Sequence, residues 1–319
     1  VLFRSPIRTL IVLHGDTVLP AEVQGVASGR VTRGHRVLMP ELEVPSAADW
    51  AVDLGGAGVG VRTADRREVI EALLASSAKA HDGTWIDPAG VLEEVVYLVE
   101  WPRVLDGSIE ERHLALPESV LITAMQSHQR YFPLRGATGT LRPVFLTVVN
   151  SHPDADAAVR AGNERVLAGR LDDAAFSLAQ DRARGIEAMA GELERITYHQ
   201  RLGTMADRTA RLIALVETLA DAAGIAGDDR AHALEAARLA KADLASTMVA
   251  EFADLQGEVG MEYARAAGAP DAVAVAIREQ YQPAGAGRPA PDSLPGALLA
   301  LADRFDQLVG VVSIGERPT

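Results

Sequence analysis

Residues Gly162–Gln180 read GNERVLAGRLDDAAFSLAQ and mark the point where the character of the chain changes. Apolar residues recur near three-, four- or seven-residue steps, and charged residues fill the other faces. The apolar set is Val166, Leu171, Ala174 and Leu178. This spacing predicts an amphipathic helix that packs one face on a core, with Gly162-Asn163 as the turn that begins it. We expect this segment to be a structural hinge between two different halves of the chain.

The sequence before this segment, residues 1–153, has the pattern of a mixed α/β domain. Short runs rich in Val, Ile and Leu are separated by turn residues, which is typical of strands of four to seven residues. These runs are LIVLHGD at 10–16, TVLPAEVQGVASG at 17–29, HRVLM at 35–39, VYLVEWP at 96–102 and PVFLTVVN at 143–150. Helical spacing over Glu68–Ala78 and in the Ser46–Leu54 region predicts two helices among the strands.

The sequence after this segment is helical. Amphipathic helices are predicted at Met205–Ala223, Arg230–Ala253, Asp271–Tyr281 and Leu294–Val312. The linker Gln282–Ser293, QPAGAGRPAPDS, is too rich in Pro and Gly to be helical. The predicted fold class is therefore α+β, with a mixed α/β domain over 1–153, a helical connector over 154–194 and an all-helical domain over 195–319.

Composition indicates an ordinary globular protein. The 319 residues have a net charge of −13, are 48% hydrophobic and include no cysteine, which excludes disulfides, thiolate metal sites and cysteine nucleophiles. No apolar run approaches the roughly 18 residues that span a bilayer, so we expect a cytoplasmic protein without membrane contact. The chain begins with Val1 rather than Met and stops at Thr319 without a polar tail, which favours an internal fragment.

A basic segment interrupts this acidic chain. Residues 1–40 hold five arginines against two acidic residues. SGRVTRGHR at 28–36 concentrates Arg30, Arg33, His35 and Arg36, with two glycines that let the backbone approach a partner closely. The net charge argues against a nucleic-acid-binding surface over the whole protein, but this segment is a candidate contact for RNA phosphates. The alternative is a solvated hairpin with ordinary surface arginines.

A second candidate is SHQRYFPL at 127–134, where His128 and Arg130 alternate with polar and aromatic residues. Clusters of basic and aromatic side chains can neutralise and stack on single-stranded RNA. Because Tyr131 and Phe132 lie beside strand-like sequence, a role for them in core or interdomain packing is the favoured alternative.

The helical half resembles the HD superfamily of metal-dependent phosphohydrolases, through Asp243 in LAKADLAS and through Asp303 and Asp306 in LADRFDQLVG. That chemistry needs an adjacent His-Asp pair, with a further His and Asp, to hold a divalent ion that activates water. The position of the pair reads Ala242-Asp243, and the only His-Asp dipeptide, His81-Asp82, lies in a loop of the other half. We therefore expect no metal site, and we interpret the three aspartates as polar or ion-paired helix residues.

Eight segments, taken in order, resemble the beta subunit of the bacterial two-subunit glycyl-tRNA synthetase. They are RSPIRTLIVLHGDTVLP (4–20), SGRVTRGHR (28–36), SHQRYFPL (127–134), GNERVLAGRLDDAAFSLAQD (162–181), YHQRLGTMADR (198–208), KADLASTMVAEFADLQGEVG (241–260), IREQYQPAG (277–285) and ALADRFDQLVGVVSIGERPT (300–319). The resemblance implies an α/β domain related to the B3/B4 module of phenylalanyl-tRNA synthetases, followed by an HD-like helical domain that does not hydrolyse phosphates.

The same resemblance implies a non-catalytic tRNA-binding and assembly subunit of glycine–tRNA ligase. Its partners would be the glycyl-tRNA synthetase alpha subunit, a second beta subunit and glycine tRNA. ATP and Mg would serve the alpha subunit, where glycine is activated, and no cofactor is implied for this fragment.

Two other interpretations stay open at this point. One is an HD-type divalent-metal phosphohydrolase, which would bind metal in stoichiometric amount. The other is a purely structural interaction module, whose helices dock a partner subunit without touching RNA.

Overall fold

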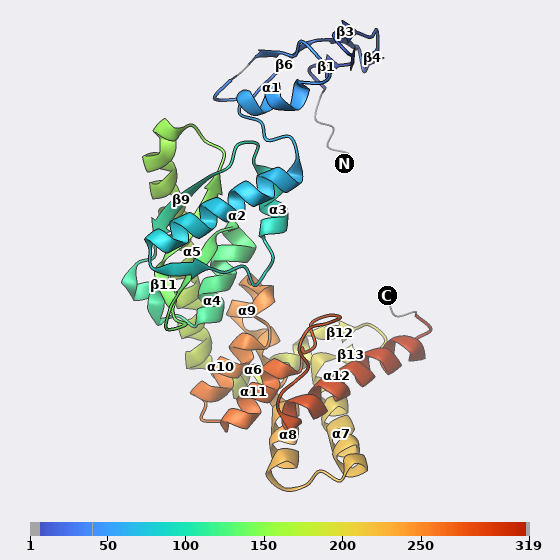
Figure 1. The fold of residues 1–319 in the computed structure, drawn as a ribbon. Helices are drawn as coiled ribbons and strands as arrows, with labels where there is room; N and C mark the ends of the chain where they lie inside the picture. Colours follow the sequence, from blue (N-terminus) through green and yellow to red (C-terminus); the bar gives the residue numbers. More distant parts are fainter. Residues whose placement is uncertain (1–6, 40, 317–319) are drawn as a thin grey trace. The chain divides into compact units, whose positions relative to one another are not determined.

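The computed structural model describes residues 7–39 and 41–316, and the chain forms two compact units, Val1–Arg170 and Leu171–Thr319 (Figure 1). Helices and several small sheets are both present, in agreement with the predicted α+β class. Among the described residues, no helix combines the length and the apolar character needed to cross a membrane. Of the five arginines in residues 1–40, Arg4 falls outside the described part.

The first unit begins with very short strands. They are β1 (Leu10–Ile11), β2 (Leu13–His14), β3 (Thr17–Val18), β4 (Glu22–Val23), β5 (Val26–Gly29), β6 (Val31–Thr32) and β7 (Leu42–Glu43), followed by helix α1 (Trp50–Gly56). β1 pairs in parallel with β5, β5 pairs antiparallel with β4, and β2–β3 and β6–β7 form separate two-stranded ladders. The strands of four to seven residues predicted at 10–16 and 17–29 were therefore, except at β5, wrong in length, because turn residues interrupt these apolar runs and keep the strands to between two and four residues.

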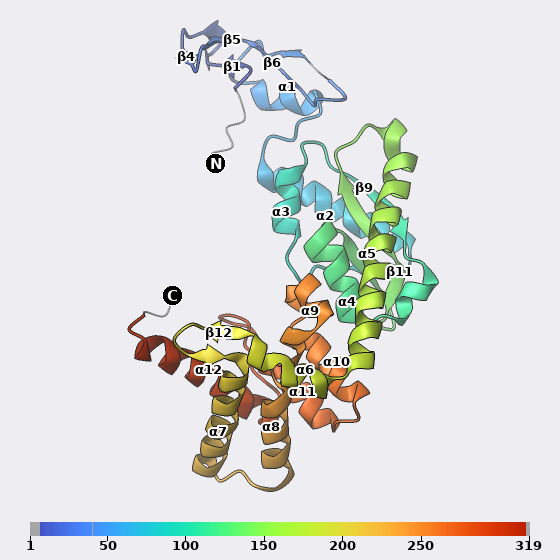
Figure 2. The ribbon, with the colours of Figure 1, turned by 180° about the vertical axis from the view of Figure 1, so that it is seen from behind.

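The body of the first unit is a four-stranded antiparallel sheet in the order β8-β10-β11-β9. Its strands are β8 (Gly83–Trp85), β9 (Arg103–Ser108), β10 (Phe132–Gly136) and β11 (Leu141–Val149). Three further helices of this unit are α2 (Thr63–Ala80), α3 (Leu92–Leu98) and α4 (Glu118–Thr123), the last of which continues into a π-helical turn over Ala124–His128. Figures 1 and 2 show α2 on one face of the sheet and α5 on the other.

A single hydrophobic core joins α2, α3 and the sheet. Ile70 and Leu74 of α2 are fully buried with Phe132, Leu134 and Leu146 of the central strands. The four-residue step between the two helical residues places both on the face that meets the sheet. The prediction of strand at 143–150 and of helix over Glu68–Ala78 is confirmed, although α2 extends beyond both ends of the latter range.

Helix α5 (Asp156–Arg184) contains the whole GNERVLAGRLDDAAFSLAQ segment, and the boundary between the two units falls inside it. The amphipathic helix is confirmed at Leu171, Ala174 and Leu178, which are buried. The prediction that Val166 belongs to the buried face was wrong, because Val166 is 51% exposed and Leu167 is buried in its place. The prediction that Gly162-Asn163 begins the helix was wrong, because α5 starts six residues earlier, directly after the 3₁₀ turn Pro153–Ala155.

The second unit consists of helices and one small hairpin. Its elements are α6 (Ile186–Glu192), β12 (Thr197–His199), β13 (Gly203–Thr204), α7 (Met205–Ala223), α8 (Gly227–Leu239), α9 (Thr247–Glu251), α10 (Glu258–Ala266), α11 (Asp271–Glu279) and α12 (Leu294–Ser313). The remaining 3₁₀ turns of the described residues, in both units, are Glu111–Ala115, Leu193–Arg195, Ala242–Ala245 and Ala253–Leu255. The linker 282–293 contains no helix, as its Pro and Gly content predicts.

Local sequence sets the ends of α7. Thr204 and Asp207 form a capping box at its start, in which the Thr204 hydroxyl accepts from the Asp207 N–H and the Asp207 carboxylate accepts from the Thr204 N–H. Gly224 ends the helix with φ of 66°, a left-handed conformation that glycine adopts without steric cost. Helix α7 therefore covers the predicted range Met205–Ala223.

Three predicted elements were wrong. HRVLM at 35–39 forms a turn rather than a strand, because the His35 N–H donates to Ala57 O and the Met39 N–H donates back to His35 O. VYLVEWP at 96–102 is not a strand, because its first three residues complete α3. The buried residues Leu92, Val95, Val96 and Val99 recur with helical spacing, a period that their β-branched composition hides.

The third wrong prediction is the continuous helix at Arg230–Ala253, which in the structure is divided into α8, a 3₁₀ turn and α9. Ser246 caps α9 by accepting from the Val249 N–H. The Asp181 carboxylate accepts from the N–H groups of the first two residues of the helix, Thr247 and Met248. A carboxylate supplied by α5 thus begins a new helix where apolar spacing alone predicts a continuous one.

Candidate functional site

Arg30, the first of the RNA-binding candidates, is held by its own unit. Its guanidinium donates to Asp16 O at 2.9 Å and to Pro45 O at 3.3 Å, and it lies 4.0 Å from the Glu43 carboxylate. These contacts join the bend between β5 and β6 to two loops, so Arg30 stabilises the short-stranded segment, and its side chain is 35% exposed.

Arg33 and Arg36 are exposed, and neither side chain has a hydrogen bond or ion pair with another described residue. The loop that carries them is held in place by buried contacts of His35 and Gly34. His35 is 1% exposed, and its Nδ1 accepts from the N–H groups of Val37 and Leu38. A Cβ at Gly34 would lie 2.6 Å from Ala57 Cβ, so only glycine fits there. The loop therefore directs two guanidinium groups outward and keeps the imidazole of His35 inside.

The segment 127–134 packs in the core, as its strand-like surroundings predict. Tyr131 is 4% exposed and stacks on Phe145 with ring centroids 4.5 Å apart, and Phe132 is fully buried. His128 Nδ1 accepts from Arg170 of α5 at 2.7 Å, and Arg130 Nε donates to Glu94 at 2.7 Å. Both basic candidates are half-buried and engaged within the unit, so they present less charge to a phosphate than Arg33 and Arg36 do.

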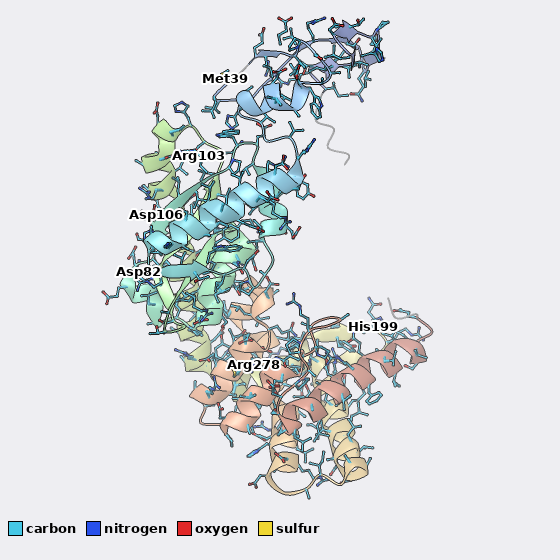
Figure 3. All side chains as sticks on the ribbon, in the orientation of Figure 1. Met39, Asp82, Arg103, Asp106, His199 and Arg278 are labelled. Carbon is cyan, nitrogen blue, oxygen red and sulfur yellow. The ribbon has the colours of Figure 1, made fainter. Side chains whose placement is uncertain are left out.

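Helix α5 is fixed to the sheet of the first unit by ion pairs. Arg103 and Asp106, labelled in Figure 3, both lie on β9. Arg103 Nη1 donates to Asp156 at 2.8 Å, and Arg160 Nη2 donates to Asp106 at 2.7 Å. His81 Nε2 lies 3.5 Å from the same Asp106 carboxylate. The His81-Asp82 dipeptide thus belongs to the surface of this sheet, and its histidine has a structural partner.

Two of the three HD-like positions, Asp303 and Asp306, belong to a buried charge cluster, which we define as Arg208, Arg211, Lys241, Asp303 and Asp306. Asp303 lies 2.8 Å from Lys241 Nζ and 3.0 Å from Arg208 Nη2. Asp306 lies 3.3 Å from Arg208 Nε and 2.5 Å from Arg211 Nε. Each of the two carboxylates therefore faces cations of the protein itself, in agreement with the ion-paired role predicted for them.

Aromatic rings enclose the cations of this cluster. The Arg208 guanidinium lies 4.3 Å from the centroid of the Tyr198 ring, and Lys241 Nζ lies 4.5 Å from that of Tyr281. Burial lowers the pKa of the Lys241 ammonium, and the Asp303 carboxylate offsets only part of that effect.

Asp243 is fully buried and stands apart from this cluster. Its Oδ2 accepts from the Gly257 N–H at 2.6 Å, and its Oδ1 has no hydrogen-bond partner among the described residues. Burial raises the pKa of this carboxyl to about 6, against the lowering effect of the Gly257 hydrogen bond. The partner that reaches Asp303 is Lys241, two residues earlier, which the sequence reasoning overlooked. An isolated lysine inside the apolar run LAKADLAS was the signal that could have identified it.

The side chains of the described residues do not suit a divalent ion. Nowhere in residues 7–39 and 41–316 do three or more His, Cys, Asp or Glu side chains gather with metal-binding geometry. A divalent ion needs its carboxylate ligands free and turned toward a common point, whereas Asp303 and Asp306 are held by Lys241, Arg208 and Arg211.

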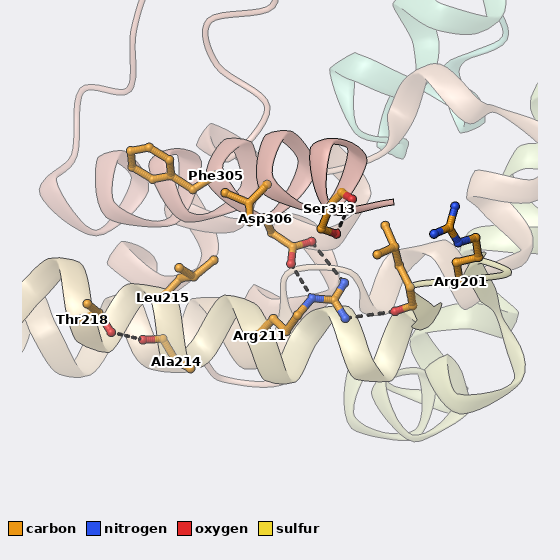
Figure 4. Close-up of a pocket in the computed structure, with 11 residues that line it drawn as sticks. Arg201, Arg211, Ala214, Leu215, Thr218, Phe305, Asp306 and Ser313 are labelled. Carbon is orange, nitrogen blue, oxygen red and sulfur yellow. Dashed lines mark hydrogen bonds and ion pairs between the residues drawn. The ribbon is translucent and has the colours of Figure 1, made fainter. Parts of the chain in front are cut away.

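A groove beside the buried charge cluster was not predicted from the sequence. It lies between α7 and α12, encloses about 540 Å³ and is mainly apolar (Figure 4). Its walls include Leu215 of α7 with Phe305 and Val309 of α12. Arg201 and Arg211 line it as well, and the latter donates to Asp306 and to Leu202 O.

Comparison with known proteins assigns the chain to a family. The family model described as "Glycyl-tRNA synthetase beta subunit" matches residues 1–319. Curated relatives named "Glycine--tRNA ligase beta subunit" include those of Desulforudis audaxviator, 44% identical over 99% of this chain, and Bacillus subtilis, 39% identical over 98% of it.

In both comparisons the match covers 46% of the relative, so the chain spans about half the length of the curated proteins it resembles. The similarity extends across both units of the fold and includes all eight of the segments singled out in the sequence. This chain belongs to the glycyl-tRNA synthetase beta subunit family.

Proposed function

We propose that the chain is the tRNA-binding and assembly part of a glycine–tRNA ligase and that it carries no catalytic residue of its own. The family match over residues 1–319 is the observation that carries this proposal. The buried charge cluster supports the non-catalytic part, because the carboxylates at the HD-like positions are neutralised by Arg and Lys instead of being free to bind a metal.

The partners follow from the same assignment. A beta subunit works with an alpha subunit, and we propose that glycine is activated there with ATP and Mg, while a second beta subunit completes the assembly in the cytoplasm. The domains of this chain would correspond to a B3/B4-like module over 1–153, a helical connector over 154–194 and an HD-like domain over 195–319.

We propose that RNA phosphates contact the first unit at Arg33 and Arg36. These two guanidinium groups are exposed and have no ionic partner among the described residues, so binding a phosphate breaks no existing ion pair. Arg30, His128 and Arg130 already bind groups within the unit, and they would support the surface rather than form the contact.

The test is a titration of glycine tRNA with the Arg33→Ala/Arg36→Ala variant at 50 and 200 mM salt. Each phosphate contact contributes about one unit to the dependence of log affinity on log salt, so the slope should fall by roughly two units and the affinity should drop most at low salt. The matched control is Arg195→Ala/Arg288→Ala, which removes the same charge from two exposed arginines of the second unit. Equal effects of the two pairs would reject a specific contact at Arg33 and Arg36.

The HD-type phosphohydrolase is the competing function, and a metal measurement separates it from this proposal. A phosphohydrolase would retain about one equivalent of divalent metal and would lose it in Asp303→Asn. We expect no stoichiometric metal in either protein, because Lys241 and Arg208 already neutralise that carboxylate.

A further inference from the structure

Helix α12 has an apolar stripe on its outer face. The stripe consists of Leu301, Phe305, Leu308, Val309 and Val312, which are between 43% and 63% exposed. Their spacing of four, three, one and three residues places them along one side of a helix. Because this side covers about three turns, it offers an apolar surface roughly 16 Å long.

The inner face of the same helix is already in use. Leu298, Leu299 and Ala302 are buried in the second unit, and Asp303 and Asp306 belong to the buried charge cluster. A helix that is apolar on both sides is normally covered on both sides, and contiguous exposed apolar surface of this kind marks interaction sites in soluble proteins.

The groove between α7 and α12 adjoins this stripe, and two of the five stripe residues line it. Phe305 and Val309 form one wall, and Ala214, Leu215 and Thr218 of α7 form the other. One end is bounded by Arg201, in the turn between β12 and β13, where a Cβ at Gly310 would lie 3.0 Å from Leu202 Cδ1. The side chain of Leu202 in this turn therefore packs closely on α12 at Gly310.

The charge at that end indicates what the groove accepts. The guanidinium of Arg211 is neutralised by Asp306, whereas Arg201 is exposed and donates to the Ile314 carbonyl, a neutral acceptor. An occupant with an apolar face and one carboxylate near its end would satisfy both the stripe and Arg201. An RNA backbone would meet a mainly apolar surface, so the chemistry favours a protein segment.

We propose that this groove holds an amphipathic helix from the same polypeptide in the longer proteins of the family. The curated relatives are about twice the length of the matched region, since the match covers 46% of each. More than half of such a polypeptide therefore lies outside the region described by this fold, and it is present at high effective concentration. The helix would pack its apolar face on the α12 stripe and pair a carboxylate with Arg201.

The first experiment compares two backgrounds. Phe305→Asp/Val309→Asp is made in this chain, and the aligned positions are changed in the full-length Desulforudis audaxviator protein, which is 44% identical. In this chain Val309 is 63% exposed and Phe305 is 43% exposed at the wall of an open groove, so neither change buries a charge and the melting temperature should change by less than about 2 °C. In the longer protein the same change places two charges in a packed contact, and the melting temperature should fall by more than about 5 °C. Equal shifts in the two backgrounds, or polar residues at the aligned positions of the relative, would overturn the proposal.

The second experiment identifies the occupant. A photo-cross-linking amino acid replaces the residue of the full-length relative that aligns with Val309, and the cross-linked peptides are sequenced by mass spectrometry. We expect an intramolecular product with a segment outside the matched region. The control places the cross-linker at the position of Glu217, which is exposed on α7 and pairs with Arg230, and should not give that product. A product with a second copy, an alpha subunit or added glycine tRNA, or no product, would contradict an intramolecular helix.

Discussion

The ammonium of Lys241 lies 2.8 Å from a carboxylate oxygen of Asp303, and both side chains are buried in the second unit. An internal ion pair of this kind stabilises a fold only while both partners are present, because each ion has lost its hydration. Lys241 and Lys79 are the only lysines of the chain, and one of them is committed to this contact. The two residues come from different elements, so the pair holds α12 to the turn that follows α8.

We expect Lys241→Met to lower the free energy of unfolding by about 3 kcal/mol or more, since among the described residues it leaves Asp303 with Arg208 as its one remaining cation. Urea denaturation followed by circular dichroism measures the loss. Lys79→Met is the matched control, because Lys79 is exposed and its replacement should change stability by less than about 0.5 kcal/mol.

The double variant Lys241→Met/Asp303→Leu should lose less free energy of unfolding than the two single variants lose in sum, because it removes both buried charges together. We expect a difference of about 1 kcal/mol or more. Additive losses would show that the pair contributes through packing alone.

Asp243→Asn should reveal a pH-dependent cost of the buried carboxyl. The pKa of Asp243 is about 6 in the folded protein, against an ordinary value of 3.8. Between pH 4 and pH 6 the Asp243 carboxyl therefore keeps its proton in the folded state and loses it in the unfolded state. This difference stabilises the folded protein at low pH, and the stabilisation is lost as the pH rises through 6. At pH 7 the asparagine variant should be more stable than the parent by up to about 3 kcal/mol, with the difference vanishing near pH 4.

Urea denaturation curves recorded from pH 4 to pH 8 test this expectation. Asp254→Asn, at an exposed aspartate of the same unit, is the control. A constant difference between parent and Asp243→Asn across the whole range would show that the carboxyl does not titrate in this window.

Gly107→Ala should destabilise the sheet of the first unit. Gly107 of β9 lies opposite Phe145 of β11, and a Cβ at this position would overlap the Phe145 ring, which is itself stacked on Tyr131. We expect a loss of about 1–3 kcal/mol from overpacking, measured by thermal denaturation. Phe145→Leu in the same chain should recover part of the loss by vacating the space.

Gly162→Ala is the control for Gly107→Ala, and its expected effect on stability has the opposite sign. Gly162 lies inside α5, and nothing is within 4 Å of the position that a Cβ would take. Alanine there should raise stability by about 0.5–1 kcal/mol, because it favours the helix. A loss at position 162 equal to that at 107 would contradict the continuous helix.

Asp181→Ala should loosen α9. The Asp181 carboxylate accepts from the N–H groups of Thr247 and Met248 and from the Tyr263 hydroxyl, at 2.9 to 3.0 Å. Its removal leaves two helix-starting N–H groups without a partner, which should cost about 2 kcal/mol. Hydrogen exchange of the Thr247 and Met248 amides is the measurement, and both should lose protection. Asp271→Ala, at an exposed residue that pairs with Arg265, should leave that protection unchanged.

The elements that could be predicted are those that local sequence specifies. The capping box of Thr204 and Asp207, the glycine at 224 and the apolar spacing between them define α7 without help from the rest of the chain. The apolar positions of α5 and the Pro- and Gly-rich linker at 282–293 are of the same kind. In contrast, the run at 95–99 could not be recognised as helical, because its β-branched residues favour a strand and hide the helical spacing of the buried positions.

The sequence by itself determined the family, the amphipathic helices and the segment that carries the candidate arginines, because each of these depends on residues close together in the chain. Only the tertiary structure decided which arginines are exposed, since His35 and Gly34 must first anchor their loop against Ala57. It also decided that Lys241 meets Asp303, and that α12 keeps an apolar face toward solvent. Burial and ion pairing depend on which residues the fold brings together, and no local pattern contains that information.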